Sequence, residues 1–197
     1  MIRRHRKPNR LKHFDYSSKG WYFVTICTKN SECLFGEIID RKMVLNRAGL
    51  IINKYWLELQ NKFKNISLDV YQIMPNHIHG IVIIDNVGND LRVVPNNNKY
   101  NVKSVRHIGR TLQNNSFPIR QQQLLFRIIR WFKTMTTNEY IKGVINNQFP
   151  RFDKQLWQKS FYDHIIRNEE SLNNIREYIQ NNPKKWSEDE ENPKNIK

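Results

Sequence analysis

The chain contains no long run of apolar residues. No segment approaches the about 20 uninterrupted apolar residues that a membrane-spanning helix requires, and the basic stretch at residues 1–7 is not followed by the apolar segment of a secretory signal. The sequence therefore predicts neither a transmembrane protein nor an exported one.

Cysteine is also scarce, with only Cys27 and Cys33 in 197 residues. A bond between the two would close only a short loop, and their spacing matches no zinc-binding pattern. We therefore expect two reduced thiols in a cytoplasmic protein.

Acidic residues are outnumbered: 18 Asp and Glu stand against 33 Lys and Arg, which gives a formal net charge of +15. Such an excess attracts polyanions, because basic side chains that neutralise phosphates release condensed counterions. Nucleic acid is the partner that this charge indicates. The alternatives are a charge that serves solubility and an anionic membrane surface, although no basic amphipathic helix with a broad apolar face supports the latter.

The apolar content of 39%, with 12% aromatic residues, is sufficient for one hydrophobic core. At this length the chain suits a single domain with appendages. We predict a basic flexible arm over residues 1–19 and one domain over 20–186. An Asn-rich inserted loop is expected at about 85–123, where no periodicity is sustained, and a charged, disordered tail at 187–197.

Runs of β-prone or alternating residues predict extended segments. These are residues 21–28, a hairpin over 35–45 that turns near Asp40-Arg41, then 66–70, 74–84 and part of 155–166. Apolar residues at helical spacing predict helices after the N-caps Asn46 and Asn168 and from Leu124 onwards, the last ending at Pro183. The fold class that follows is α+β, with an antiparallel sheet covered by helices.

Two histidines, His77 and His79, flank Ile78 at the start of the apolar run that ends at Ile84. Successive side chains alternate faces along a strand, so the two imidazoles point the same way, roughly 6–7 Å apart. At that separation they can share one divalent ion. The alternative is a pair of hydrogen-bonded histidines at the entrance of a strand.

The predicted last helix carries Tyr178 and Asn182, four residues apart and therefore on one face. Tyr178 lies at the edge of the apolar stripe formed by Leu172, Ile175 and Ile179, which aims it towards the body of the protein. The alternative is a tyrosine at the edge of the core beside a C-terminal asparagine.

Five further residues are candidates for DNA contact. Arg127, Arg130 and Lys133 lie off the apolar stripe of the helix that follows the inserted loop, where they face either phosphates or only solvent. Trp157 could stack on an unpaired base, with core packing as the alternative. His164 is either a DNA contact or a buried, hydrogen-bonded histidine.

Three ordered motifs then carry a resemblance to a known family. They are Pro75-Asn76-His77-Ile78-His79-Gly80, the segment Leu156-Trp157-Gln158 with Phe161-Tyr162-Asp163-His164-Ile165-Ile166-Arg167-Asn168, and Tyr178-Ile179-Gln180-Asn181-Asn182-Pro183. In these motifs the chain resembles the REP-associated tyrosine transposases, which are HUH single-tyrosine nucleases related to the small transposases of insertion sequences. The resemblance runs from about residue 21 to 186 and leaves out the insertion.

The resemblance implies a ferredoxin-like fold with the histidine pair on a central strand. It makes His77 and His79 metal ligands, Tyr178 the nucleophile and Asn182 the group that completes the metal site. The chain departs from the family at two places: insertion-sequence relatives usually have Gln where Asn182 stands, and several have an acidic residue where Asn76 stands. Relatives work as dimers, and some exchange the tyrosine helix, so monomer and homodimer both stay open.

The activity that the resemblance implies is metal-dependent cleavage and transfer of single-stranded DNA at hairpin-forming repeats. A phenol with a pKa of about 10 is mostly protonated at neutral pH. A Mg²⁺ or Mn²⁺ ion beside the phosphate would neutralise charge and orient the attack that gives a 5′-phosphotyrosine. Imidazole ligands favour Mn²⁺. Tyr162 is the rival nucleophile, but the residue four positions after it is the apolar Ile166, where Tyr178 has Asn182. The alternatives are hairpin binding without cleavage and hydrolysis by a metal-bound hydroxide.

Overall fold

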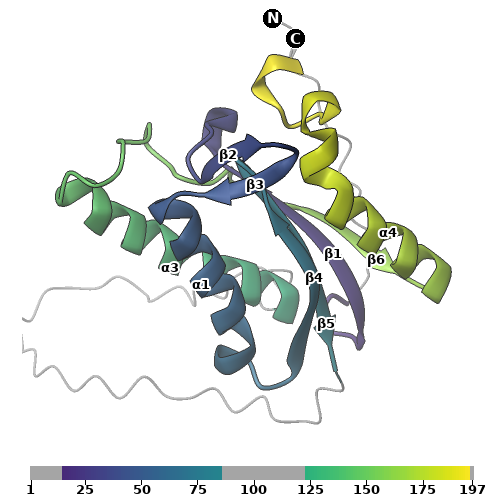
Figure 1. The fold of residues 1–197 in the computed structure, drawn as a ribbon. Coiled ribbons are helices and arrows are strands. Elements are labelled where there is room, and N and C mark those ends of the chain that lie inside the picture. The colour runs from purple at the N-terminus through teal and green to yellow at the C-terminus, as the bar shows by residue number, and fades with distance from the viewer. Residues whose placement is uncertain (1–14, 86–122, 196–197) are drawn as a thin grey trace, which may run out of the picture.

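The computed structural model describes residues 15–85 and 123–195 (Figure 1). Six elements follow one another in the order strand, helix, strand, strand, helix, strand, and a further helix comes after them. They are β1 (Gly20–Cys27), α1 (Arg47–Lys62), β4 (Ile66–Ile73), β5 (His77–Ile84), α3 (Leu124–Ile145), β6 (Tyr162–Ile166) and then α4 (Glu169–Asn181). The hairpin β2 (Gly36–Ile39) and β3 (Lys42–Leu45) precedes α1, and a short 3₁₀ turn covers Lys29–Ser31.

The main sheet has the strand order β4-β5-β1-β6, and every neighbouring pair is antiparallel. This order, with one crossover helix after β1 and one after β5, is the ferredoxin-like arrangement. The predicted fold class is confirmed, and the histidine pair lies on the central strand β5.

The two faces of the sheet are covered by different helices (Figure 1). On one face α1 and α3 pack against alternate residues of the central strands, so that Trp56 and Phe132 meet Val24 and Ile78 in one core. On the other face α4 covers a smaller cluster, which consists of Phe23, Ile81, Ile166, Leu172 and Ile179. His77 and His79 are four and two positions before Ile81 on the same strand, so the three side chains point to the same face. This is the face that α4 covers.

Gly80 lets the core approach β5 closely. A Cβ atom at this position would lie 2.3 Å from Cζ2 of Trp56, well inside van der Waals contact. The absence of a side chain between His79 and Ile81 therefore allows the fully buried indole to pack directly on the strand that carries the histidines.

The local signals that define the elements appear in the structure as the sequence predicts. The Oδ1 atoms of Asn46 and Asn168 accept hydrogen bonds from Gly49 N at 2.9 Å and Ser171 N at 2.8 Å, which caps α1 and α4. The β2–β3 turn places Asp40 and Arg41 at φ 48° and 61°, the left-handed pair that a tight hairpin requires.

The C-terminal segment differs from the prediction of a disordered tail after Trp186. The α4 helix ends at Asn181, but the chain continues as 3₁₀ turns over Asn182–Glu188 and Pro193–Asn195. Glu191 and Asn192 are buried. The charged composition predicts disorder, but hydrogen bonds hold this segment: Asn192 Nδ2 donates to Trp186 O at 2.8 Å, and Asn76 Nδ2 donates to Glu191 O at 2.7 Å.

Most of the predicted N-terminal arm and nearly all of the predicted inserted loop lie outside the described residues. Within the described part, Tyr16 is 1% exposed and packs against Phe126 with the ring centroids 5.6 Å apart. Among the described helices, none combines the length and apolar character that a bilayer crossing requires.

Candidate metal and tyrosine site

The two imidazoles of β5 converge. His77 and His79 are 0% and 3% exposed, and their Nε2 atoms lie 3.0 Å apart. The strand places both side chains on the α4 face, and their ring centroids are 4.4 Å apart. Two ring nitrogens thus point at one common place in the interior of the site.

Asn76 determines which nitrogen of His77 carries the proton. Its Nδ2 donates to two backbone carbonyls, Ser31 O at 3.1 Å and Glu191 O at 2.7 Å, so its oxygen must face His77. That oxygen lies 2.8 Å from His77 Nδ1 and can only accept. By this assignment Nδ1 of His77 is protonated and its Nε2 offers a lone pair to the site.

His79 is held in a similar way by the neighbouring strand. Its Nδ1 lies 2.8 Å from Thr25 Oγ1, directly across the β1–β5 register. Burial, and then the neighbouring His77, lower the pKa of His79 well below its ordinary value, although Asp189 acts in the opposite direction. The ring is therefore neutral and has two tautomers. When Thr25 accepts from Nδ1, Nε2 of His79 carries a lone pair that can bind a cation; when Thr25 donates to Nδ1, Nε2 of His79 donates to Nε2 of His77. A metal-binding histidine usually donates a hydrogen bond from its other ring nitrogen, which fixes the orientation of the ring.

A carboxylate stands beside the two imidazoles. His77, His79 and Asp189 each offer one ligand atom, and these atoms all lie within 4.8 Å of one another. The arrangement could hold a metal ion. Sequence reasoning missed Asp189, because it lies in a charged segment without periodicity that was expected to be disordered.

Asn182, the predicted third ligand, reaches the same place. It is 3% exposed, and its Nδ2 donates to Asp189 Oδ2 at 2.7 Å. Its Oδ1 is buried and has no hydrogen-bond partner, which is costly unless a cation or water meets it. Two imidazole nitrogens, a carboxylate and an unsatisfied amide oxygen form a donor set that fits Mn²⁺ or Mg²⁺.

Tyr178 projects from α4 towards this group. Its hydroxyl lies 3.4 Å from His79 Nε2, and its ring stands edge-on to Phe23 with centroids 6.1 Å apart. Tyr178 is 48% exposed, and its partial burial, together with the charges of Asp189, Glu191 and Glu190, raises its pKa to about 12. The phenol is therefore protonated at neutral pH, and it reaches the histidines of its own chain.

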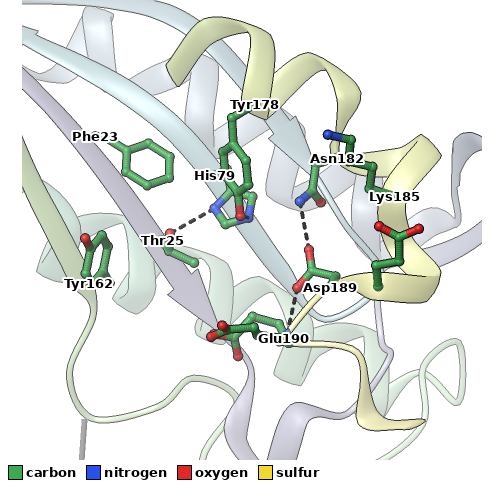
Figure 2. Close-up of a pocket in the computed structure, with 11 residues that line it drawn as sticks. Phe23, Thr25, His79, Tyr162, Tyr178, Asn182, Lys185, Asp189 and Glu190 are labelled. Atoms are coloured by element: carbon green, nitrogen blue, oxygen red, sulfur yellow. Dashed lines mark hydrogen bonds between the residues drawn. The ribbon is translucent and has the colours of Figure 1, made fainter. Parts of the chain in front are cut away.

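An open cleft of about 640 Å³ leads to these groups (Figure 2). Thr25, His79, Tyr162 and Tyr178 line it together with the acidic residues 188–191. In Figure 2, the Tyr178 hydroxyl and the Asn182–Asp189 pair lie on either side of the space beside His79. The cleft is large enough for part of an extended ligand to meet the tyrosine.

The predicted basic contacts lie elsewhere. Arg127 and Arg130 are exposed on α3, which covers the sheet face opposite the histidines. Lys133 donates to Gln158 O and Ser160 O, each at 2.9 Å, and thereby holds the loop before β6.

The two remaining candidates differ in exposure. Trp157 is 4% exposed and donates from Nε1 to Thr136 Oγ1 at 2.9 Å, so its ring packs in the core and is not open to a base. His164 is exposed on β6, where it is the cross-strand neighbour of Phe23 on β1. Of the nine predicted site residues, the structure thus brings together His77, His79, Tyr178 and Asn182.

Among solved structures, the fold is similar to that of a REP-associated tyrosine transposase bound to a REP hairpin. The TM-score is 0.51 at 16% identity, over 90% of this chain and 74% of the transposase chain. A likeness at this identity concerns the fold alone.

A scan against models of known protein families finds no match. An uncharacterised protein of Haemophilus influenzae (strain ATCC 51907 / DSM 11121 / KW20 / Rd) is 39% identical over 188 residues, which cover 94% of this chain and 92% of that protein. With this identity over nearly the whole of both proteins, the chain belongs to the same family as the Haemophilus influenzae protein.

Proposed function

We propose that this chain is a metal-dependent endonuclease and strand transferase of the tyrosine transposase type, acting on single-stranded DNA at hairpin-forming repeats. The observation that carries the proposal is the hydroxyl of Tyr178, 3.4 Å from Nε2 of a histidine whose partner histidine and Asp189 could hold a metal ion. The three sequence motifs support it, and so does the fold likeness to a transposase described as bound to a REP hairpin.

The ligands we propose are His77, His79 and Asp189, with the amide oxygen of Asn182 as a fourth. A bound Mn²⁺ or Mg²⁺ would supply positive charge for the oxygens of a phosphodiester. Asn76 and Thr25 orient the two imidazoles, since each contacts the ring nitrogen that faces away from the site.

The chemical step that we propose is a transesterification at phosphorus. The Tyr178 oxygen forms a bond to the phosphorus, and the bond between that phosphorus and the 3′ oxygen breaks. The phenolic proton passes to a cleft carboxylate or to water, and the departing 3′ oxygen takes up a proton, so protons balance. The product is a 5′-phosphotyrosine and a free 3′-hydroxyl. Because one ester replaces another, the strand can be rejoined to a new 3′-hydroxyl.

The acidic residues 188–191 give the cleft an unusual charge for a DNA-binding site. A phosphodiester that enters meets the carboxylates of Glu188, Asp189, Glu190 and Glu191, all of which line the cleft. Like charges repel most strongly where water is partly excluded. A divalent cation held by His77, His79 and Asp189 would offset this repulsion, so we expect strand binding in the cleft to need the metal.

The proposal is tested with a labelled single-stranded hairpin from the source genome, incubated with the protein and Mn²⁺ or with EDTA. A denaturant-resistant adduct should form with Mn²⁺, persist in Tyr162→Phe and disappear in Tyr178→Phe. The matched phenylalanine variants remove one hydroxyl from each of two tyrosines that line the same cleft.

The other outcomes identify the alternatives. Cleavage that leaves no adduct and survives Tyr178→Phe would indicate hydrolysis by a metal-bound hydroxide. Hairpin binding without cleavage under any divalent metal would indicate a binding protein. An adduct that forms in Tyr178→Phe and not in Tyr162→Phe would move the nucleophile to β6.

A further inference from the structure

The helix that carries Tyr178 rests on a narrow apolar stripe. In α4 only Leu172 and Ile179 are buried, and Ile175 packs partly beside them. One row of side chains holds a helix at a fixed height above a sheet, but it resists rotation about the helix axis only weakly. A helix attached in this way needs a second, lateral contact if its side groups are to stay in place.

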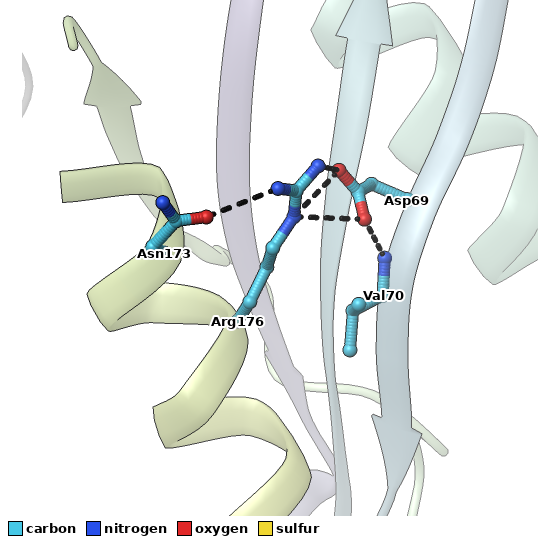
Figure 3. A network of polar contacts seen from close by, with 4 residues as sticks. All are labelled: Asp69, Val70, Asn173 and Arg176. Carbon is cyan, nitrogen blue, oxygen red and sulfur yellow. Dashed lines mark hydrogen bonds and ion pairs between the residues drawn. The ribbon is translucent and has the colours of Figure 1, made fainter. Parts of the chain in front are cut away.

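An ion pair between α4 and the edge of the sheet supplies such a contact (Figure 3). Arg176 Nε donates to both carboxylate oxygens of Asp69, at 3.3 and 3.1 Å, and Nη2 donates to Oδ2 at 2.5 Å. A third guanidinium nitrogen, Nη1, donates to Asn173 Oδ1 at 3.2 Å. The guanidinium is thus held by Asp69 of β4, 107 residues earlier in the chain, and by Asn173 of its own helix.

The position of Asp69 depends on an irregularity of β4. The β4–β5 register shifts between Leu68 and Tyr71, and the Asp69 side chain accepts from Val70 N at 2.7 Å within this bulge. Bulges re-aim side chains at sheet edges. The Asp69 carboxylate is 14% exposed. Burial raises the pKa of Asp69, but the hydrogen bonds from Arg176 and Val70 and the charge of Arg176 outweigh it and leave the pKa below its usual value.

We infer that Asp69 and Arg176 are positioning residues for the reaction: their pairing fixes the rotation of α4 and thereby the depth at which the Tyr178 hydroxyl enters the site. The inference rests on the proposed function. Arg176 and Tyr178 are two residues apart, about 200° around the helix, so they lie on opposite flanks of the apolar stripe. A roll of about 20° at a side-chain radius of about 6 Å moves the hydroxyl by about 2 Å.

Such a displacement matters because the attack is an in-line displacement at phosphorus. Misplacement of a reacting group by about 1 Å can lower a rate about a hundredfold. A second ion pair in the molecule provides a comparison. Lys142 and Glu139 on α3 make one contact of 3.0 Å, with side chains 68% and 33% exposed, and they join two residues of the same helix. Because both residues belong to α3, this ion pair cannot fix the orientation of one helix relative to the sheet.

Arg176 could instead contact a DNA phosphate, and the two roles give opposite results for Asp69. If Arg176 binds DNA, removal of the Asp69 charge releases the guanidinium and raises hairpin affinity. If the pair positions α4, removal of either partner lowers the rate of adduct formation and leaves affinity unchanged. Asp69→Asn is suited to this test because an amide oxygen can still accept from Val70 N.

The experiment measures single-turnover adduct formation at saturating hairpin with Mn²⁺, together with the half-saturating hairpin concentration and the thermal midpoint. The variants are Asp69→Asn, Arg176→Gln, Arg176→Lys and the double Asp69→Asn/Arg176→Gln, with Lys142→Gln as the matched control. We expect the two single neutral variants to lose about tenfold to a hundredfold in rate. The double variant should lose no more than either, and Arg176→Lys should recover part of the rate. The half-saturating concentration should stay unchanged in all of them.

A wild-type rate in Asp69→Asn, an increase in its hairpin affinity, or equal losses in Lys142→Gln would overturn the inference. A wild-type protein that forms no adduct would refute the proposed function instead. Positioning is then read from the ¹⁹F resonance of 3-fluorotyrosine at position 178, identified by its loss in Tyr178→Phe. This resonance should shift or broaden in Asp69→Asn and Arg176→Gln but not in Lys142→Gln. An unchanged resonance in both would overturn the positioning role independently of any activity.

Discussion

The hydroxyl of Tyr178 lies 3.4 Å from Nε2 of His79, 99 residues earlier in the chain. The two meet because β5 is a central strand and α4 crosses the face of the sheet to which His79 points. A weakly acidic phenol, two buried imidazoles and the Asp189 carboxylate are thereby gathered beside one cleft. The role of each of these groups can be tested by a separate measurement.

Metal binding should depend on Asp189 as well as on the histidines. We expect Mn²⁺ affinity, measured by titration calorimetry, to be lost in His79→Ala and to fall at least about tenfold in Asp189→Asn, because an amide is a weaker ligand than a carboxylate. Glu188→Gln is the matched control, an acidic cleft residue outside the His77–His79–Asp189 group. Equal affinities in Asp189→Asn and wild type would remove Asp189 from the ligand set.

The acidity of Tyr178 should be abnormally low in the absence of metal. Burial, followed by the charges of Asp189, Glu191 and Glu190, raises the pKa of Tyr178 to about 12. Between a pKa of about 10 in the unfolded chain and the raised value, the folded chain keeps a proton that the unfolded chain loses. The free energy of unfolding should therefore fall as pH rises through this window.

The tyrosinate absorbance difference between wild type and Tyr178→Phe measures this titration directly. Glu190→Gln should lower the midpoint, since it removes one of the charges that oppose ionisation. A midpoint near 10 in the metal-free protein would show that neither burial nor the cleft carboxylates raise the pKa of the phenol.

Hairpin binding should require a divalent metal, and the carboxylates of the cleft should be the reason. With EDTA we expect weaker binding than with Mn²⁺, and in Glu188→Gln/Glu190→Gln the difference should shrink because two repulsive charges are removed. Fluorescence anisotropy at constant ionic strength separates this effect from general screening. Binding that is equally tight with and without metal would contradict the assigned charge balance.

The close contact between Gly80 and Trp56 predicts a stability effect. In Gly80→Ala the new Cβ would lie 2.3 Å from the indole, so we expect a loss of about 1–3 kcal/mol from overpacking. Gly20→Ala is the control, since a Cβ there meets its nearest atom, in Tyr22, at 3.7 Å. Urea unfolding measures both. Similar stabilities for the two variants would show that the core yields at Trp56 without cost.

Much of this arrangement follows from local patterns in the sequence. Apolar periodicity, the caps Asn46 and Asn168 and the turn at Asp40-Arg41 predict the elements, because each is determined by residues within a few positions. The alternation of a strand predicts that His77 and His79 share a face. Their convergence at 3.0 Å depends on Asn76, which directly precedes β5, and on Thr25, which lies on the neighbouring strand β1.

The parts that the sequence did not predict depend on contacts between distant residues. Asp189 lies in an acidic stretch that looks unstructured, and its place follows from bonds such as that between Asn76 and the Glu191 carbonyl, 115 residues apart. Asp69 and Arg176 are 107 residues apart. Trp157 shows a different limit of sequence-based prediction. The sequence around an aromatic residue looks the same whether the ring stacks on a base or packs in the core. Burial alone distinguishes the two.

The central claim is that the Tyr178 oxygen becomes bonded to DNA phosphate, and peptide mass spectrometry of the adduct tests it most directly. Trypsin cleaves after Arg176 and Lys184 and after Lys159 and Arg167, so Tyr178 and Tyr162 fall in different peptides, 177–184 and 160–167. After nuclease trimming of the Mn²⁺-dependent adduct, we predict the nucleotide mass on Tyr178 in peptide 177–184. A nucleotide on peptide 160–167, or on neither peptide despite cleavage, would contradict the account.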